Sequence, residues 1–385
     1  MSSSKPSRHE PLSDREIRAT TEWLRSQQRP SGEIPWGQGA KMDPWDHVHS
    51  AMGLCAVGHT AEARAAYRFM AETQDPNGGW AAERRGGKAT RITQESNHAA
   101  YLATGLWHQY SHERDPDFLV EMWPTLERAI DLVVSMQLPS GAIAWAQKNG
   151  KVWRAPLVTG SSSIHGSLVC AIRIAERLGH DRPGWRRAHE RLQRTLRHDE
   201  RVFSDTDLPE KPGRHSMDWY YPVLGGALRG EAGRTRLLDA ELTDAFIEEG
   251  VGCRCVKDHP WYTIAETCEL VLALDACGLR QRAREVFSWT RWQRCDDSGA
   301  YWTGATYPAG EIFPEGEQTT WTAAAVLIAH DTLHRDTRTS EFFRELCGGD
   351  LMEAPARPRI ERPRPERPVE RPVAGSVGEI STPAE

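Results

Sequence analysis

The sequence lacks the features that mark several large classes of protein. It contains no apolar run of membrane-spanning length, and residues 1–10 are polar where a secretory signal would need an apolar stretch. It also carries no excess of positive charge, because its net charge at pH 7 is −6. These absences argue against a membrane protein and against a nucleic-acid-binding protein, and they predict a cytoplasmic location.

Cysteine is sparse and scattered, with eight residues in a chain of 385. This usage is typical of core positions in a reducing compartment and not of a disulfide framework. Cys253 and Cys255, followed by Asp258 and His259, suggest zinc ligands at first sight. However, the Cys-x-Cys spacing differs from the usual Cys-x2-Cys turn, and no second cluster completes a tetrahedral site. We therefore expect neither a metal nor another cofactor.

Tryptophan and helical periodicity are abundant. Fifteen tryptophans are many for this length, and the tryptophan ring suits both core packing and stacking on sugars. Apolar residues recur with helical spacing almost throughout, whereas few segments alternate as strands do. Short extended pieces are expected near residues 152–153 and 301–302. The pattern predicts helices in six pairs.

A short phrase recurs at the ends of several predicted helices: glutamine, a turn, glycine and then tryptophan. Its copies begin at Gln28, Gln74, Gln137 and Gln293, a spacing of about 50 residues or a multiple of it. Such a repeat indicates one helical hairpin used many times. The second helix of each pair is the less charged one, so we predict an all-α (α/α)6 barrel, or toroid. Its inner helices are expected at residues 44–57, 92–110, 161–178, 217–229, 261–277 and 318–335.

We expect this barrel to span residues 13–350. Residues 1–12 are predicted to form a flexible N-terminal arm. Residues 351–385 are rich in proline, arginine and glutamate, and a segment of this composition buries too little apolar surface to fold. The sequence therefore predicts a disordered tail after the barrel.

The repeated phrase resembles those of two kinds of helical toroid. It is similar to the repeats of terpenoid cyclases and protein prenyltransferase β-subunits, and also to six-hairpin glycosidases, in which a Gln-Pro-Asp-Gly-Trp loop is frequent. The resemblance implies the fold, whereas the reaction has to be argued from the site. A terpenoid cyclase would need complete acidic motifs, and the pairs Asp205 with Asp207 and Asp296 with Asp297 are only fragments of them.

The site is expected at one rim of the barrel, where loops from the outer helices lead into the N-termini of the inner helices. Polar and aromatic residues cluster at those helix starts. The candidates for general acid and base are Asp46, Glu95, Asp218 and Glu266. The alternative is that these acids cap helices or pair with Arg91, Arg154 or Arg214.

Further residues at the same helix starts are predicted to bind the substrate. The aromatic platform for sugar rings would consist of Trp45, Trp219, Tyr220, Trp261 and Trp321. The groups that orient hydroxyls would be His47, Asn97, His165 and Tyr262, with Glu317 as a further acid. The expected partner is a small molecule or an oligosaccharide.

Three functions follow, in order of preference. The first is a carbohydrate-active enzyme of the six-hairpin glycosidase type, which cleaves or otherwise processes a glycosidic bond with carboxylates as general acid and base. The second is an enzyme similar to prenyltransferases or terpenoid cyclases that acts on an isoprenoid. The third is a toroid that binds a glycan without catalysis.

Overall fold

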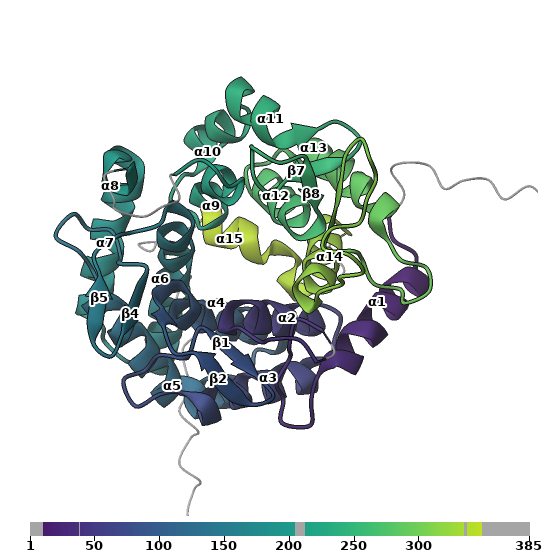
Figure 1. Cartoon of the computed structure of the whole chain (residues 1–385). Helices are drawn as coiled ribbons and strands as arrows, with labels where there is room; N and C mark the ends of the chain where they lie inside the picture. Colours follow the sequence, from purple (N-terminus) through teal and green to yellow (C-terminus); the bar gives the residue numbers. More distant parts are fainter. Residues whose placement is uncertain (1–10, 38, 205–211, 335–336, 349–385) are drawn as a thin grey trace, which may run out of the picture. The chain divides into compact units, whose positions relative to one another are not determined.

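The inner wall of the barrel is a closed ring of six helices (Figure 1). They are α2 (Pro44–Ala56), α4 (Ser96–Glu113), α6 (Val158–Leu178), α9 (Met217–Leu224), α12 (Ile264–Ala276) and α14 (Thr320–His334). Each helix packs against the next in this order, and α14 packs against α2, which closes the ring. The predicted all-α (α/α)6 barrel is thereby confirmed.

The computed structural model describes residues 11–37, 39–204, 212–334 and 337–348. The tail predicted over residues 351–385 lies outside the described residues. Of the predicted arm only Pro11 and Leu12 are described, and the Leu12 side chain is buried. No helix in the described part of the chain is long and apolar enough to cross a bilayer.

A second layer of helices surrounds the ring. It consists of α1 (Asp14–Gln27), α3 (Thr60–Thr73), α5 (Pro116–Ser135), α7 (Pro183–His198), α10 (Gly230–Leu237), α11 (Ala240–Phe246) and α13 (Arg280–Ser288). The first of these, α1, packs against the last inner helix, α14, so the two ends of the barrel meet. The helical periodicity of residues 233–248 predicts one outer helix there, but the structure has two, because Asp239 caps a new helix by accepting a hydrogen bond from the Leu242 amide. Short helices α8 (Arg201–Ser204) and η1 (Trp289–Gln293) extend this layer.

Several predicted helix ends need correction. The starts at residues 92 and 261 are too early, because residues 94–95 and 261–263 form strands that lead into the helices. The start at residue 161 is too late, because α6 begins at Val158. The end at residue 229 is also wrong: Gly225 ends α9, and a Cβ atom there would lie 2.0 Å from the Ser162 carbonyl oxygen.

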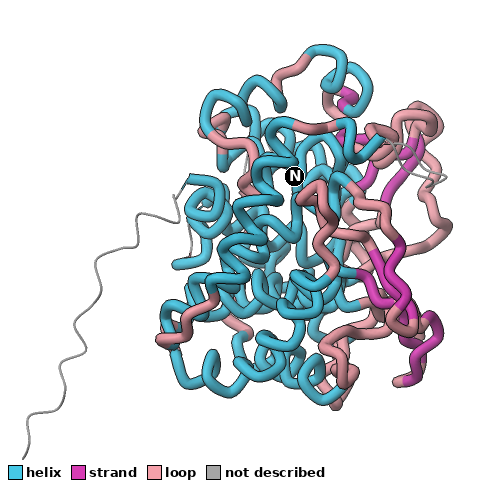
Figure 2. Tube along the Cα trace, turned by 90° about the vertical axis from the view of Figure 1, so that its left-hand side faces the viewer, coloured by secondary structure: helices cyan, strands magenta, loops and turns pink. Residues whose placement is uncertain are grey.

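Short strands occupy the loops that lead into the inner helices, and they gather at one end of the barrel (Figure 2). They are β1 (Glu83–Arg85), β2 (Lys88–Arg91), β3 (Gln94–Glu95), β4 (Ala146–Lys148), β5 (Lys151–Trp153), β6 (Ile247–Glu248), β7 (Gly252–Arg254), β8 (Trp261–Thr263) and β9 (Gly304–Thr306). They form antiparallel sheets in the orders β1-β2, β3-β4-β5 and β6-β7-β8-β9. The extended piece predicted near residues 152–153 is confirmed as β5, whereas near 301–302 only Tyr301 forms an isolated bridge.

The opposite end of the barrel is closed by the last described segment of the chain. After α14 come η2 (Arg338–Glu341) and α15 (Phe342–Gly348), and α15 crosses the middle of the ring in Figure 1. It packs against α6, α9 and α12, and the Phe342 ring contacts His108 near the C-terminal end of α4. The inner helices therefore surround a space that is covered at their C-terminal ends.

The repeated glutamine and glycine brace one outer helix to the next. In three copies the glutamine amide donates to the glycine carbonyl of its own turn and to a carbonyl of the following outer helix. The bonded sets are Gln28 with Gly32 and Glu62, Gln74 with Gly78 and Thr125, and Gln137 with Gly141 and Ala188. The phrase is thus a structural device of the outer layer, which explains its even spacing.

Glycine is required in the turn that joins one outer helix to the next. The φ angle of Gly78 is +95°, and a Cβ atom there would lie 2.2 Å from the carbonyl oxygen of Arg128 in α5. We expect Gly78→Ala to lower the free energy of unfolding by about 3 kcal/mol or more, because α5 must move as well. Gly86→Ala is the matched control, since Gly86 has a positive φ but no atom near its absent side chain, and it should cost only about 1 kcal/mol. Equal losses in the free energy of unfolding of the two variants, measured by urea unfolding, would contradict this role of Gly78.

Candidate active site

The first turn of α2 presents an aromatic ring and an acid to the interior of the ring. Asp43 caps this helix, and Pro44 follows at its first position. Trp45 stacks on Tyr101 of α4 with ring centroids 4.3 Å apart and planes 1° from parallel. Asp46 is buried beside them, and burial together with the neighbouring Asp43 carboxylate raises the pKa of Asp46 well above its usual value. Asp46 therefore keeps its proton to higher pH than an ordinary aspartic acid does.

A second acid lies at the start of α12. Strand β8 leads directly into this helix, and Glu266 lies in its first turn with only 4% of its surface exposed. Its Oε2 atom is buried and has no hydrogen-bond partner among the described residues. A buried carboxylate oxygen without a partner is costly unless a ligand or water satisfies it, so this atom marks a place for one.

One helical turn further along α12, Glu269 is held by two tyrosines of α9. The hydroxyls of Tyr220 and Tyr221 each donate to one of its carboxylate oxygens at 2.7 Å. Burial raises the pKa of Glu269 to about 8, although these hydrogen bonds act in the opposite direction. Trp321 of α14 lies beside the same carboxylate. Glu269 thus links three inner helices.

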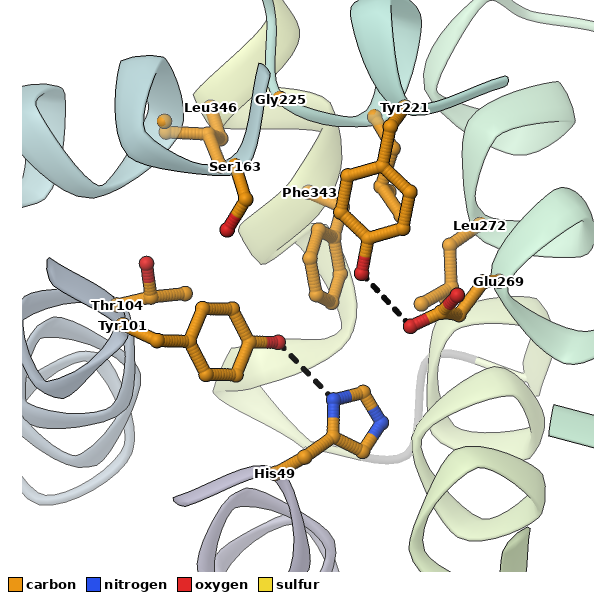
Figure 3. A pocket seen from close by; sticks show the side chains of 12 residues that line it. His49, Tyr101, Thr104, Ser163, Tyr221, Gly225, Glu269, Leu272, Phe343 and Leu346 are labelled. Carbon is orange, nitrogen blue, oxygen red and sulfur yellow. Dashed lines mark hydrogen bonds between the residues drawn. The ribbon is translucent and has the colours of Figure 1, made fainter. Parts of the chain in front are cut away.

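Below this layer lies a small cavity at the centre of the barrel (Figure 3). Its walls include His49, Tyr101, Tyr221 and Glu269, and the Phe343 ring of α15 lies at its base. The His49 Nδ1 atom and the Tyr101 hydroxyl share a hydrogen bond of 3.0 Å. A volume of about 20 Å³ holds little more than one water molecule, so this cavity is too small for a sugar ring.

The raised pKa of Glu269 implies that the stability of the protein depends on pH. Between about pH 4.5 and about pH 8 the folded protein holds a proton that the unfolded chain has lost, so the free energy of unfolding falls as pH rises. We expect Glu269→Gln to remove this part of the decline. Urea unfolding across this pH range tests it, with Glu72→Gln on the exposed surface as the control that keeps the wild-type slope. Parallel curves for Glu269→Gln and the wild type would contradict it.

The other two predicted acids have their oxygens engaged. Glu95 accepts a hydrogen bond of 2.6 Å from Arg91 and lies 3.4 Å from His98 Nε2. In Asp218, Oδ1 accepts from the Thr159 hydroxyl at 2.7 Å and Oδ2 accepts from the Gly213 amide at 2.9 Å. Glu95 thus makes the pairing with Arg91 that the sequence offered as an alternative, whereas Asp218 binds groups that were not predicted. A part in catalysis stays a prediction for both acids.

Three predicted binding residues point away from the interior. His47 accepts from the Ile34 amide and bonds the Ala66 carbonyl of α3, so it joins the two helical layers. His165 bonds the Gly225 carbonyl and lies against His189 of α7. Trp219 donates to the Arg236 carbonyl and stacks on Phe246. All three stand at inner helix starts, but on faces that meet the outer layer.

The remaining predicted residues lie at the rim. Asn97 and Trp321 are half-buried in the first turns of α4 and α14, and Glu317 is half-buried in the loop before α14. Tyr262 is buried, and its hydroxyl accepts a hydrogen bond from Arg254 at 2.7 Å. The half-buried Trp261 precedes it on β8.

The possible zinc ligands do not converge. Cys253 is buried, whereas Asp258 and His259 are exposed, and Asp258 pairs with Arg214 at 3.2 Å. Within the described ranges, no group of three or more His, Cys, Asp or Glu residues is placed to hold a metal ion.

Four residues of the interior were not predicted from the sequence: His49, Tyr101, Tyr221 and Glu269. Helical spacing was the available signal for two of them. His49 lies three residues after Asp46, and Glu269 lies three residues after Glu266, so each shares a helix face with a predicted acid.

Comparison with known proteins identifies the chemistry. The chain is 44% identical over 333 residues to the MMP endo-(1,4)-3-O-methyl-alpha-D-mannosidase of Mycolicibacterium hassiacum, covering 86% of this chain and 90% of that protein. No protein-family model matches the chain.

Solved structures agree in fold. A glycosidase variant in complex with glucose has a TM-score of 0.61 at 15% identity, covering 84% of this chain and 99% of that one. A sugar epimerase from a ruminal bacterium has a TM-score of 0.62 at 12% identity, with the same coverage of both chains. The preferred hypothesis of a glycoside hydrolase is confirmed, and the chain belongs to the family of the MMP endo-(1,4)-3-O-methyl-alpha-D-mannosidase.

Proposed function

We propose that this protein hydrolyses internal α-(1,4) bonds in a polymer of 3-O-methylmannose. The observation that carries the proposal is the 44% identity to a mannosidase of that specificity over nearly the whole barrel. The buried acids and stacked aromatic rings at the N-terminal ends of the inner helices agree with it. The eight cysteines are all free, as a reducing compartment such as the cytoplasm requires.

We assign the general acid to Asp46. A general acid has to keep its proton to higher pH than an ordinary carboxyl does, and the raised pKa of Asp46 agrees with that role. The proton passes to the glycosidic oxygen as the bond to the leaving sugar breaks. Asp43 supports this role, because its carboxylate accepts from the Asp46 amide at 2.9 Å and its charge holds the pKa of Asp46 high.

We assign the second carboxylate to Glu266. It lies on a different inner helix from Asp46, as two carboxylates that flank a sugar should. Its Oε2 atom has no hydrogen-bond partner among the described residues, whereas both oxygens of Glu269 accept from tyrosine hydroxyls. Glu266 then acts on the side of the sugar that faces away from Asp46, where it either takes a proton from the water that attacks the anomeric carbon or attacks that carbon itself and is later displaced by water. In both cases the anomeric carbon ends with a hydroxyl from water in place of the leaving sugar.

The test is hydrolysis of purified substrate. The protein is incubated with a 3-O-methylated α-(1,4)-mannose oligosaccharide, and product sizes are followed by mass spectrometry. Internal cleavage releases fragments of intermediate length from the first time points. Release of single sugars alone would contradict the endo assignment, and equal turnover of an unmethylated α-(1,4)-mannose chain would contradict the methylated substrate.

A further inference from the structure

We infer that two exposed aromatic platforms bind the sugars that flank the cleaved bond. The platforms lie on opposite sides of the end of the barrel that carries the strands, which we call the mouth. The first platform consists of Trp145 and Trp153, and the second of Trp261 and Phe313. This inference rests on the proposed function, because it assigns the outer part of the same polymer-binding surface.

The first platform stands on a sheet that is joined to an inner helix. In this sheet Glu95 pairs with Ala146, and Ala146 pairs with Trp153. Paired residues point to the same face of a sheet, so Trp153 shares a face with Glu95 at the start of α4. The Trp153 side chain is exposed to 38%, and its ring centroid lies 5.7 Å from that of Trp145.

Trp145 adds a polar group to this platform. Its indole N–H is buried and has no hydrogen-bond partner among the described residues. Buried donors are normally satisfied, so this one is suited to a ligand oxygen. A ring face and a donor side by side match a sugar, which has both an apolar face and oxygen acceptors.

The second platform is fixed before any ligand arrives. The Trp261 indole donates to the Phe313 carbonyl at 2.8 Å and lies across Gly304, where a Cβ atom would approach Nε1 to 2.4 Å. The rings of Trp261 and Phe313 meet edge to face, with centroids 5.4 Å apart and planes at 89°. Phe313 is exposed to 53% and Tyr307 nearby to 42%. An ordered ring loses little conformational entropy on binding, so exposed aromatic groups of this kind favour affinity.

The order of the inner ring sets the two platforms on opposite sides. Strand β3 leads into α4, and β8 leads into α12. In the ring α2-α4-α6-α9-α12-α14, these two helices have two others between them in either direction. Figure 1 accordingly has β4 and β5 on one side of the ring and β7 and β8 on the other. A chain bound at both platforms crosses the mouth above Asp46 and Glu266.

The occupant we assign is the 3-O-methylated mannose chain itself. An enzyme that cuts internal bonds meets sugars on both sides of its acids, which matches platforms on two sides. A methyl ether replaces a hydroxyl donor with an apolar group, so it can be buried on an aromatic ring without losing a hydrogen bond to water. The exposed phenylalanine Phe313 in particular offers only apolar contact.

The experiment compares Trp153→Ala and Phe313→Ala with the wild type on a long methylated chain and on the shortest oligosaccharide that is cleaved. Binding is measured by calorimetry, and kcat/KM is measured in parallel. We expect each variant to bind and cleave the long chain about tenfold less well while retaining turnover of the short one. Val120→Ala, which removes an exposed apolar side chain from the outer helix α5, is the control and should change neither.

The possible results separate the two proposals. The wild type could bind the long chain without cleaving it, while Trp153→Ala no longer binds it. This result would support the platforms and contradict the proposed hydrolysis. Unchanged binding of the long chain in both platform variants would overturn the platforms and leave the hydrolysis standing. An equal loss on long and short substrates would also overturn them, because the aromatic rings would then act through the fold of the rim.

Discussion

Glu266→Gln is expected to lower the turnover number on the methylated mannose oligosaccharide by about a thousandfold or more. Glutamine keeps the shape of the side chain but removes the negative charge and the ability to accept a proton. Glu266 is buried, its Oε2 atom has no hydrogen-bond partner among the described residues, and the neighbouring Cys255 thiol can still donate to the oxygen of a glutamine side chain. Substrate binding by calorimetry and the melting temperature should therefore stay close to those of the wild type.

Glu95→Gln is the matched control for that variant. Glu95 stands at the start of the inner helix opposite α12, but its oxygens face Arg91 and His98. This substitution should reduce turnover far less, and the double variant should behave like Glu266→Gln alone. Turnover of Glu266→Gln within a few-fold of the wild type would exclude Glu266 from the chemistry, and an equal loss in Glu95→Gln would bring Glu95 back.

Asp46→Asn has the second large effect, and its size depends on the leaving group. Without a proton donor, kcat/KM for the natural sugar linkage should fall by about 10²–10⁴-fold. An aryl glycoside of the same oligosaccharide needs no proton to leave, so its hydrolysis should fall far less. Parallel kinetics on the two substrates measure the difference. Equal losses on both would show that Asp46 positions the substrate and does not protonate it.

Asp43→Asn tests the same role by a different route. Asparagine still caps α2, but it lacks the charge that raises the pKa of Asp46. Asp46 then loses its proton at lower pH, so the basic limb of the pH profile should move to lower pH while activity at the acidic side is kept. An unmoved basic limb would contradict the assignment of that limb to Asp46.

The fold was predictable because many weak signals along the chain agree. Helical periodicity gave the number of hairpins, and Asp43 with Pro44 marked a helix start that the structure confirms. The strands were missed for the most part because segments of two to four residues are too short to show alternation. The closing helix α15 was missed for a different reason: its place depends on contacts with helices far away in the sequence.

The site was only partly predictable, because a helix turns by about 100° at each residue. Trp45, Asp46 and His49 face the interior, whereas His47 between them faces α3. Whole helix starts were predicted as one surface, so the prediction included residues that join the two layers. Glu269 was not predicted because this acid lies within an apolar run, and the two tyrosines of α9 that bind it lie far away in the sequence.

Among the described residues, helix α15 covers the end of the barrel opposite the strands. In the proposed mechanism, substrate therefore enters at the end that carries the strands, and every fragment released near Asp46 leaves by the same route. Incoming and outgoing chains therefore compete for one passage. The enzyme should accordingly slow down as its own fragments accumulate, with inhibition that is overcome by more substrate, and the length of those fragments should govern how soon it sets in.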